Sequence, residues 1–371
     1  MNTLSRRNFL HGSALIGVSV AAAAMTPMAA VAAGPKNCRS VKEVFSMSDV
    51  DMAKNSEVVQ SAYDTIVSVA KKINNSSLRS SILSILENPA PSIAEGNEAG
   101  ILSSLKKEKL IASDAKAIFP RIQNKKQSPQ PFWSAPGSGY GSHHAYPGGL
   151  ATHTALNVVS AQALYENYRH INNLDLDWDD AVGGEILHDL HKPWVFQWEK
   201  NHACRVEQTL AGTGEHHVLS VAESIKRGIK PSLVVAQACA HEHPSSKQGE
   251  ALVVGWLKAA SIIAGVDPVK SGLLAADQKT LPLPRRMEGY VVHLADHDWV
   301  ISSSACQWSV QALKDLAKEQ YGITDETQFN AFRNYVLANL TAMRLYGILS
   351  SQGRKAFAAD VARVIMHATF R

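Results

Sequence analysis

The histidines of this 371-residue chain are concentrated in one stretch, because thirteen of the fifteen fall between His143 and His297. Among them is a doublet, His188-Asp189, within the string Ile-Leu-His-Asp-Leu-His-Lys-Pro. Imidazole and carboxylate side chains are the ligands that proteins use to hold transition-metal ions for hydrolysis. A carboxylate in apolar surroundings needs a partner, and the nearby choices for Asp189 are Lys192 or a metal ion. The doublet therefore predicts a metal site.

Further histidines and an aspartate complete a set of candidate ligands around this doublet. The candidates are His153, His188, Asp189, either His216 or His217, either His241 or His243, and Asp296. A single buried histidine is more often a hydrogen-bonded core residue than a ligand, so only the whole set indicates a metal site. Zinc-finger-like sites take close pairs of ligands from small loops, whereas these candidates are spread along the chain. We therefore expect the metal at the centre of a helical bundle.

Helical periodicity runs through nearly all of the chain after the first of these candidates. The segments with apolar residues at helical spacing are 150–168, 179–190, 215–227, 231–240, 249–265, 286–303, 312–321, 325–350 and 355–369, with a break expected at Gly353. No run of alternating apolar and polar residues is long enough for a sheet. The predicted fold class is all-α, and the candidate ligands fall on successive helices.

The chain before these helices has two regions that differ in composition. Residues 34–127 are predicted to be a helical region, with helices from Val41 to about Leu110, and they contain no residues that suggest chemistry. Residues 128–149 are rich in proline, glycine and aromatic residues, which predicts a structured loop whose rings either pack it down or line the mouth of a site. We therefore expect a helical N-terminal region (34–127), a metal-binding domain (128–305) and C-terminal helices (306–371) that pack on that domain.

The first 33 residues are predicted to be a signal peptide rather than part of the fold. The string Ser-Arg-Arg-Asn-Phe-Leu, which begins at Ser5, matches the twin-arginine pattern, and an apolar stretch ending in Ala-Val-Ala follows. The alternative is an uncleaved anchor, because an apolar run of roughly 20 residues can span a bilayer. The leader hypothesis predicts a twin-arginine translocase as export partner, a periplasmic or secreted location and no stable membrane insertion.

Charge and cysteine content narrow the functional classes. The formal net charge is +4, which does not suggest a nucleic-acid-binding surface, so no nucleic-acid partner is expected. The four cysteines, Cys38, Cys204, Cys239 and Cys306, form no Cys-x-x-Cys motif. This spacing disfavours a redox pair or attached haem. Buried thiols and a single disulfide both remain open for an exported protein.

Four strings together resemble the HD superfamily of metal-dependent phosphohydrolases. They are HAYPGGLATHT at 144–154, LHDLHKP at 187–193, AHEH at 240–243 and LAD at 294–296. The ligand order of that family is histidine, histidine-aspartate, optional further histidines and a distal aspartate. The first string is similar to the opening of the HD domain in a bacterial 3′-to-5′ exoribonuclease. This resemblance covers roughly residues 140–300 and implies an HD-type helical bundle.

The resemblance also implies a role for each matching residue. Asp189 would bridge two metal ions through its two oxygens and so act directly in catalysis. The implied primary ligands are His153, His188, Asp189 and Asp296, and the implied ligands of a second ion are His216 and His241. Histidine and carboxylate without thiolate favour a divalent manganese, iron or nickel ion and are compatible with zinc or magnesium.

Three residues near these ligands affect what the resemblance implies about substrate binding and about the number of metal ions. Lys192 resembles the family's lysine that binds phosphate charge as it develops, although a lysine at a helix end can also complement the helix dipole. His191 stands where the family usually has glycine, so it would either contact phosphate or narrow the pocket. Glu242 splits the family's usual histidine pair, which leaves both one and two ions open.

Three functions from different classes fit this sequence. The first is an exported metal-dependent phosphohydrolase that cleaves a small-molecule, nucleotide-like phosphoester with a metal-activated water. The second is an HD-type di-iron oxygenase, and the third is a catalytically silent metal-containing binding protein. A ferritin-like di-iron bundle would need the Glu-x-x-His motif of Glu185 and His188 twice, and no second copy follows on a later helix. We therefore expect Glu185 either behind a ligand or at the surface.

Overall fold

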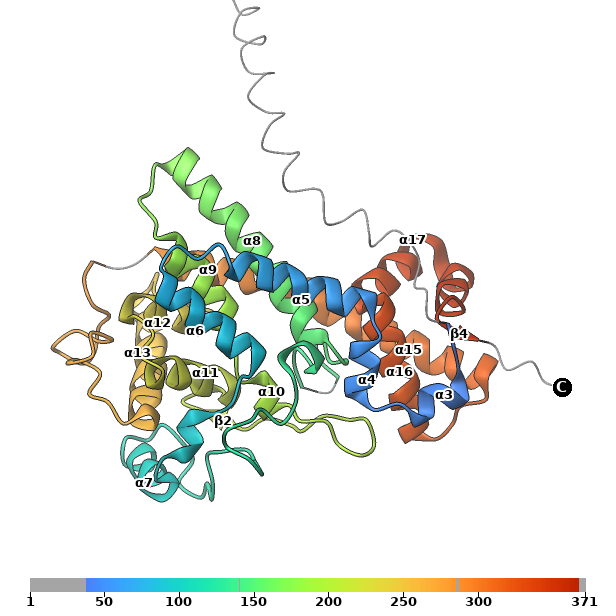
Figure 1. Cartoon of the computed structure of the whole chain (residues 1–371), viewed down its shortest axis with the longest axis horizontal. Helices are drawn as coiled ribbons and strands as arrows, with labels where there is room; N and C mark the ends of the chain where they lie inside the picture. The colour runs from blue at the N-terminus through green and yellow to red at the C-terminus, as the bar shows by residue number, and fades with distance from the viewer. Residues whose placement is uncertain (1–37, 140, 285–286, 367–371) are drawn as a thin grey trace, which may run out of the picture. The chain divides into compact units, whose positions relative to one another are not determined.

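Helices form most of the structure, a computed structural model that describes residues 38–139, 141–284 and 287–366 (Figure 1). Strands in these ranges are limited to short pairs, so the predicted all-α class is confirmed. No helix of the described ranges is long and apolar enough to cross a bilayer. The predicted signal peptide, residues 1–33, lies outside the described residues.

The N-terminal region forms a series of short helices, as its periodicity predicts. They are α3 (Val41–Ser46), α4 (Asp49–Lys54), α5 (Glu57–Ala70), α6 (Ser76–Glu87) and α7 (Glu98–Lys107), with the 3-10 turns η2 (Ser92–Glu95) and η3 (Phe132–Ser134). Polar side chains begin these helices: Ser56 accepts a hydrogen bond from Val59 N, and Asn75 accepts one from Leu78 N. Such caps satisfy main-chain donors that have no partner within the first turn.

A further set of helices covers the part of the chain that holds the candidate ligands. They are α8 (Gly149–Asn172), α9 (Trp178–Leu187), α10 (Lys192–Val195), α11 (Glu215–Lys226), α12 (Pro231–Ala238), α13 (Lys247–Ala264) and α14 (Glu288–Ala295). α9 packs against α8, α12 and α14, and α5 packs along α8. Glycine permits the close approach of α9 to α12, because a Cβ at Gly183 would lie only 2.7 Å from Leu233 Cδ1. A candidate ligand follows soon after the end of each of α9, α12 and α14: His188, His241 and Asp296.

The C-terminal helices differ from the predicted boundaries. They are η4 (Asp296–Asp298), α15 (Trp299–Tyr321), α16 (Glu326–Leu340) and α17 (Ala342–Val361). The expected break between residues 303 and 312 is wrong, because α15 is continuous. The expected single helix 325–350 is also wrong: it is interrupted at Thr341, which has φ 58° and ψ 151° and whose side chain accepts a hydrogen bond from Arg344 N. The predicted break at Gly353 is present as a bend with φ 79°.

Buried apolar side chains form two large cores. The larger lies among α5, α6, α8, α9, α11, α12 and α13. The second joins the N-terminal helices α3 and α4 to α15, α16 and α17, and it places Val44 and Met52 among Phe332 and Leu345. Figure 1 shows α3 and α4 (blue) beside these C-terminal helices (orange to red). The two ends of the described chain therefore share one core.

Two short strand pairs supplement the helices. β1 (Arg39–Ser40) pairs in parallel with β4 (Ile365–Met366), which adds a main-chain link between the two ends of the described chain. β2 (Thr209–Leu210) pairs antiparallel with β3 (Thr213–Gly214), and this hairpin directly precedes α11. The hairpin therefore lies close in sequence to the predicted ligand His216.

The cysteines are thiols, which is the first of the two alternatives that the sequence left open. Cys204, Cys239 and Cys306 are buried thiols, and Cys38 is an exposed thiol. No disulfide joins any of them in the described residues. Burial raises the pKa of Cys239 to about 12, so this thiol is inert at neutral pH.

Candidate metal centre

Four predicted ligands meet at one point inside the bundle. His153 comes from α8, His188 and Asp189 directly follow α9, and Asp296 follows α14. His153 Nε2 lies 3.3 Å from Asp189 Oδ2 and 3.1 Å from Asp296 Oδ1. His188 Nε2 lies 3.0 Å from Asp189 Oδ2 and 3.3 Å from Asp296 Oδ1. We call these four atoms the first ligand group.

The spacing of the first ligand group fits a single shared ion. Two ligand atoms that each lie about 2.1 Å from an ion are about 3.0 Å apart at a right angle and about 3.4 Å apart at a tetrahedral angle. The four measured distances, 3.0 to 3.3 Å, fall in this interval. His188 Nε2 is also buried without a hydrogen bond, which is costly unless a cation binds there.

A main-chain contact fixes the orientation of His188. Its Nδ1 donates a hydrogen bond of 2.7 Å to the main-chain oxygen of Glu185. Burial opposes a charged ring, but Asp189, Glu185 and Asp296 outweigh it and raise the pKa of His188 well above its usual value, so Nε2 carries a proton that pairs with the carboxylates. A metal ion that displaces this proton would meet the Nε2 lone pair already directed at the carboxylates. The side chain of Glu185 is fully buried behind His188 and is not at the surface. Burial raises the pKa of Glu185 to about 8.

The other oxygen of Asp189 faces a second set of histidines. Asp189 Oδ1 lies 3.5 Å from His216 Nε2, and ligand atoms of Asp189, His216 and His241 all lie within 4.8 Å of one another. His216 Nε2 is buried without a hydrogen bond. We call Asp189 Oδ1, His216 and His241 the second ligand group. Asp189 therefore has the geometry of a carboxylate shared between two ions.

The two alternative histidines are directed elsewhere. The His217 ring stacks on His241 at 4.2 Å between centroids, and its Nε2 donates to the main-chain oxygen of Ala238. The His243 ring lies against Tyr290 and His293. The structure thus brings His216 and His241 to Asp189 but not His217 or His243.

The electrostatics of the centre favour a bound cation. Burial disfavours ionised carboxylates, but the nearby His188 outweighs it and holds the pKa of both Asp189 and Asp296 well below the usual range. Burial and the neighbouring His217 and His216 hold the pKa of His241 well below its usual value. His241 is therefore neutral at physiological pH, which is the form that binds metal. Buried negative charge beside a neutral imidazole is the donor set of a divalent transition ion.

Lys192 lies at the same centre. Its Nζ is 2.5 Å from Asp189 Oδ2 and donates a hydrogen bond of 2.5 Å to the main-chain oxygen of Gly137. Lys192 also lines a cavity of about 300 Å³ that opens onto both ligand groups. A cation at this wall can contact an anionic group that enters the cavity, as the sequence predicts.

His191 is placed away from the cavity. It is fully buried, and its Nε2 lies 3.3 Å from Glu223 Oε2 while its ring contacts Trp194. Its main-chain N–H donates to Ser220 Oγ. The structure does not bring His191 to the other predicted site residues, because the turn after α9 directs its ring toward α11 instead. The substrate contact predicted for His191 has no geometric support.

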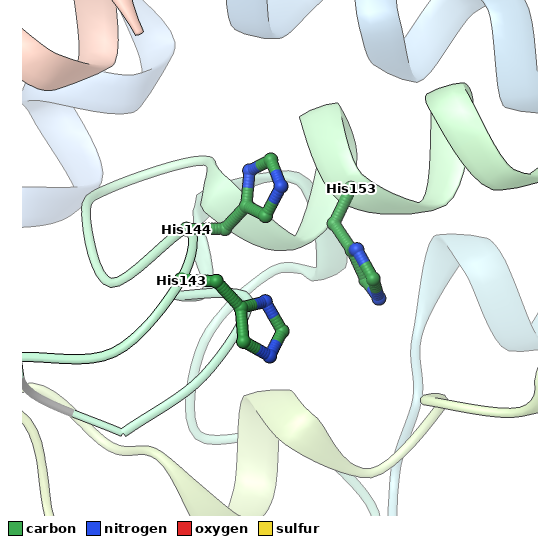
Figure 2. Close-up of side chains that lie close together, drawn as sticks. All are labelled: His143, His144 and His153. Carbon is green, nitrogen blue, oxygen red and sulfur yellow. The ribbon is translucent and has the colours of Figure 1, made fainter. Parts of the chain in front are cut away.

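Two histidines that were not predicted as ligands lie beside the first group. Figure 2 shows His143 and His144 on the loop before α8, near His153 on that helix, and ligand atoms of all three lie within 4.8 Å of one another. His144 Nε2 donates a hydrogen bond of 2.5 Å to Asp298 Oδ2, so this ring is already engaged. His143 lines the cavity, and burial lowers its pKa to about 2. Two adjacent histidines within the glycine-rich loop are the sequence signal that could have predicted histidines beside the first ligand group.

Polar residues that support the ligands were also missed. Asn157 lies one turn after His153, and its Nδ2 donates to Asp296 Oδ1 at 3.1 Å. Glu207 Oε2 accepts a hydrogen bond of 2.5 Å from His216 Nδ1. Thr213 Oγ1 lies 3.1 Å from His241 Nδ1. Trp299, at the start of α15, adds a half-exposed aromatic ring to the cavity lining.

Comparisons with known proteins identify no relative: no family model, curated protein or solved structure matches this chain.

Proposed function

We propose that this protein is an exported metal-dependent phosphohydrolase with an HD-type helical bundle, acting on a small, nucleotide-like phosphoester. The observation that carries this proposal is the position of Asp189, whose two oxygens face two different sets of histidines. A single carboxylate between two ligand sets is the arrangement used to hold two divalent ions about 3.5–4 Å apart. The HD resemblance of the sequence names the same residues.

Each residue of the centre has a defined part in this proposal. The first ligand group would hold one ion, and the second ligand group would hold the other. Bound divalent ions supply an activated water and Lewis-acid contacts to phosphate oxygens. Lys192 lies on the cavity wall beside Asp189, where its charge can bind the phosphate as negative charge develops. His143 and Trp299 line the cavity and limit the volume open to the rest of the substrate.

Metal analysis combined with a substrate screen tests the proposal. The purified chain, loaded separately with manganese, iron, nickel, zinc or magnesium, is assayed on phosphomonoesters, phosphodiesters and cyclic nucleotides. We expect one or two ions per chain and metal-dependent phosphate release. Asp296→Asn, which removes a charged ligand of the first group, should lower both metal content and rate.

Two other outcomes would replace the proposal. Oxygen-dependent turnover by the iron-loaded protein, without phosphate release, would support the di-iron oxygenase. Bound metal without turnover on any phosphoester or with oxygen would support a binding protein. Export is tested separately, by whether replacement of Arg6 and Arg7 with lysine retains the protein in the cytoplasm.

A further inference from the structure

One short segment contacts the side chains of both histidines of the second ligand group. Glu207 precedes β2 and accepts the hydrogen bond of His216 Nδ1 at 2.5 Å. Thr213, in β3, places its hydroxyl 3.1 Å from His241 Nδ1. We call residues 207–214 the hairpin segment. In His216 this contact is to the nitrogen opposite the one that faces Asp189, and in His241 it leaves Nε2 as the nitrogen without a hairpin contact.

A glycine in the hairpin segment permits this approach. A Cβ at Gly214 would collide with the carboxylate of Glu207. Gly214 has φ −64°, which any residue can adopt, so the requirement for glycine there is steric rather than conformational. The absence of a side chain at Gly214 leaves room for the carboxylate directly against His216.

The far end of the hairpin segment is fixed by two other parts of the fold. Ala211 N donates a hydrogen bond of 2.7 Å to the main-chain oxygen of Leu110, which follows α7. Trp256 Nε1, on α13, donates a hydrogen bond of 3.1 Å to the main-chain oxygen of Ala211. The ring of Trp256 also packs edge-on against His217, which stacks on His241. The N-terminal helical region therefore reaches the metal centre through the hairpin segment.

A partner on Nδ1 affects how a histidine binds metal. It fixes the ring orientation and the tautomer, and a carboxylate partner also makes Nε2 a stronger donor. Loss of such a partner typically weakens metal binding by roughly 10- to 100-fold. Glu207 is an anionic partner and Thr213 is a neutral one, so the contribution of Glu207 should be the larger.

We propose that Glu207 and Thr213 are positioning residues that control binding of the second ion, independently of the first. This inference rests on the two-ion centre of the proposed function. The first ligand group makes no contact with either residue among the hydrogen bonds and ion pairs of its described side chains. Changes in the hairpin segment should therefore act on one of two binding steps.

Titration of the metal-free full chain with Co²⁺, followed by visible absorbance and calorimetry, separates these steps. We expect Glu207→Gln to weaken the second binding step by roughly 10- to 100-fold and to change the cobalt absorbance of that step, while the first step is unchanged. Glu199→Gln, which removes an exposed carboxylate from the same connecting segment, is the matched control and should change neither step. Thr213→Val should weaken the second step less than Glu207→Gln does, and Thr213→Ser should restore it.

Several results would overturn the inference. They are equal weakening of both steps, no change in the Glu207→Gln and Thr213→Val variants, or a wild-type chain that binds only one Co²⁺. A lower melting temperature of metal-free Glu207→Gln would show a general loss of folding, and Thr213→Val then decides whether the second step is selectively affected. The proposed function fails by a different result, the absence of metal-dependent phosphate release, so the two failures are distinguishable.

Discussion

The two ligand groups of the metal centre share Asp189 but are held by different kinds of structure. The first takes its residues from α8 and from the ends of α9 and α14, and His188 is oriented by a main-chain carbonyl beside it. The second takes His216 from the start of α11 and His241 from the turn after α12, and both are supported by hairpin side chains. The second group therefore depends for its support on side chains of a hairpin segment, whereas His188 of the first group is supported by the main chain of its own helix.

The groups also differ in charge. The first contains both Asp189 and Asp296, whereas the second contains only the shared Asp189 and two imidazoles. Carboxylates attract a divalent ion more strongly than neutral imidazoles do at equal distance. We therefore expect the first ion to bind more tightly and the second to be the one that is gained or lost as conditions change.

The largest effect is expected at the residue that belongs to both groups. Asp189→Ala removes the oxygens that face His188 and His216, so it should abolish binding of both ions and all hydrolysis. Elemental analysis after dialysis against dilute metal measures this. Normal metal content in the variant would contradict the assignment of Asp189 and remove the basis for the comparison.

A pair of histidine variants separates the two groups. His216→Ala should leave about one ion per chain and spare the tighter binding step, whereas His188→Ala should weaken that tighter step. Calorimetric titration with Co²⁺ resolves the steps. His243→Ala is the control, because the ring of His243 lies against Tyr290 and His293 and not against Asp189. Loss of metal in this control would reverse the choice between His241 and His243.

Lys192 should affect the rate of hydrolysis without affecting the number of metal ions bound. Lys192→Ala removes the charge beside Asp189 but no ligand atom, so metal content should persist while the rate falls by about 100-fold, as for loss of one group that stabilises the transition state. The measurement is kcat on the best phosphoester together with metal analysis of the same sample. Equal rates with and without Lys192 would exclude it from the mechanism.

The smallest effect on rate is expected at Glu223, on the same helix as His216 but outside the cavity. Burial disfavours its charge, but His191 and Arg227 outweigh burial and lower the pKa of Glu223 to about 2. Its ionised form therefore contributes stability above the ordinary pKa of 4.5, and this is lost as pH falls from 4.5 toward 2. Glu223→Gln should lower the free energy of unfolding by about 3 kcal/mol at pH 7 and by less at pH 3.

Denaturant titration at the two pH values measures this stability difference. Metal content and kcat of folded Glu223→Gln at pH 7 should match those of the wild type, because the side chain does not reach the cavity. A loss of the second ion in this variant would mean that α11 transmits changes along its length to His216. The second group would then be even less independent of its surroundings than its hairpin contacts indicate.

Sequence patterns predicted the helical class and a set of candidate ligands with Asp189, because buried charges and histidines on apolar helices are unusual enough to stand out. The choice of His216 and His241 over their neighbours came from the HD resemblance and not from the pattern. The predicted helix 325–350 failed at Thr341, where no glycine or proline interrupts the apolar periodicity. The contacts of Glu207 and Thr213 could not be predicted, since they depend on how a hairpin folds back over α11. The sequence placed His191 at the substrate because it is next to Lys192. The geometry of the turn after α9 instead directs its ring away from the cavity.

The shared core at the two ends of the described chain has a consequence for the order of folding. Val44 and Met52 need Phe332 and Leu345 as neighbours, and Arg39 pairs with Ile365, so these contacts span nearly the whole length of the polypeptide. Contacts between residues so distant in sequence form late and slow the completion of folding. The N-terminal helices remain without their partners until the ribosome has released the last helix. For a protein that we propose is exported, a nascent or truncated chain would thus still expose apolar surface, while the full-length chain would bury it.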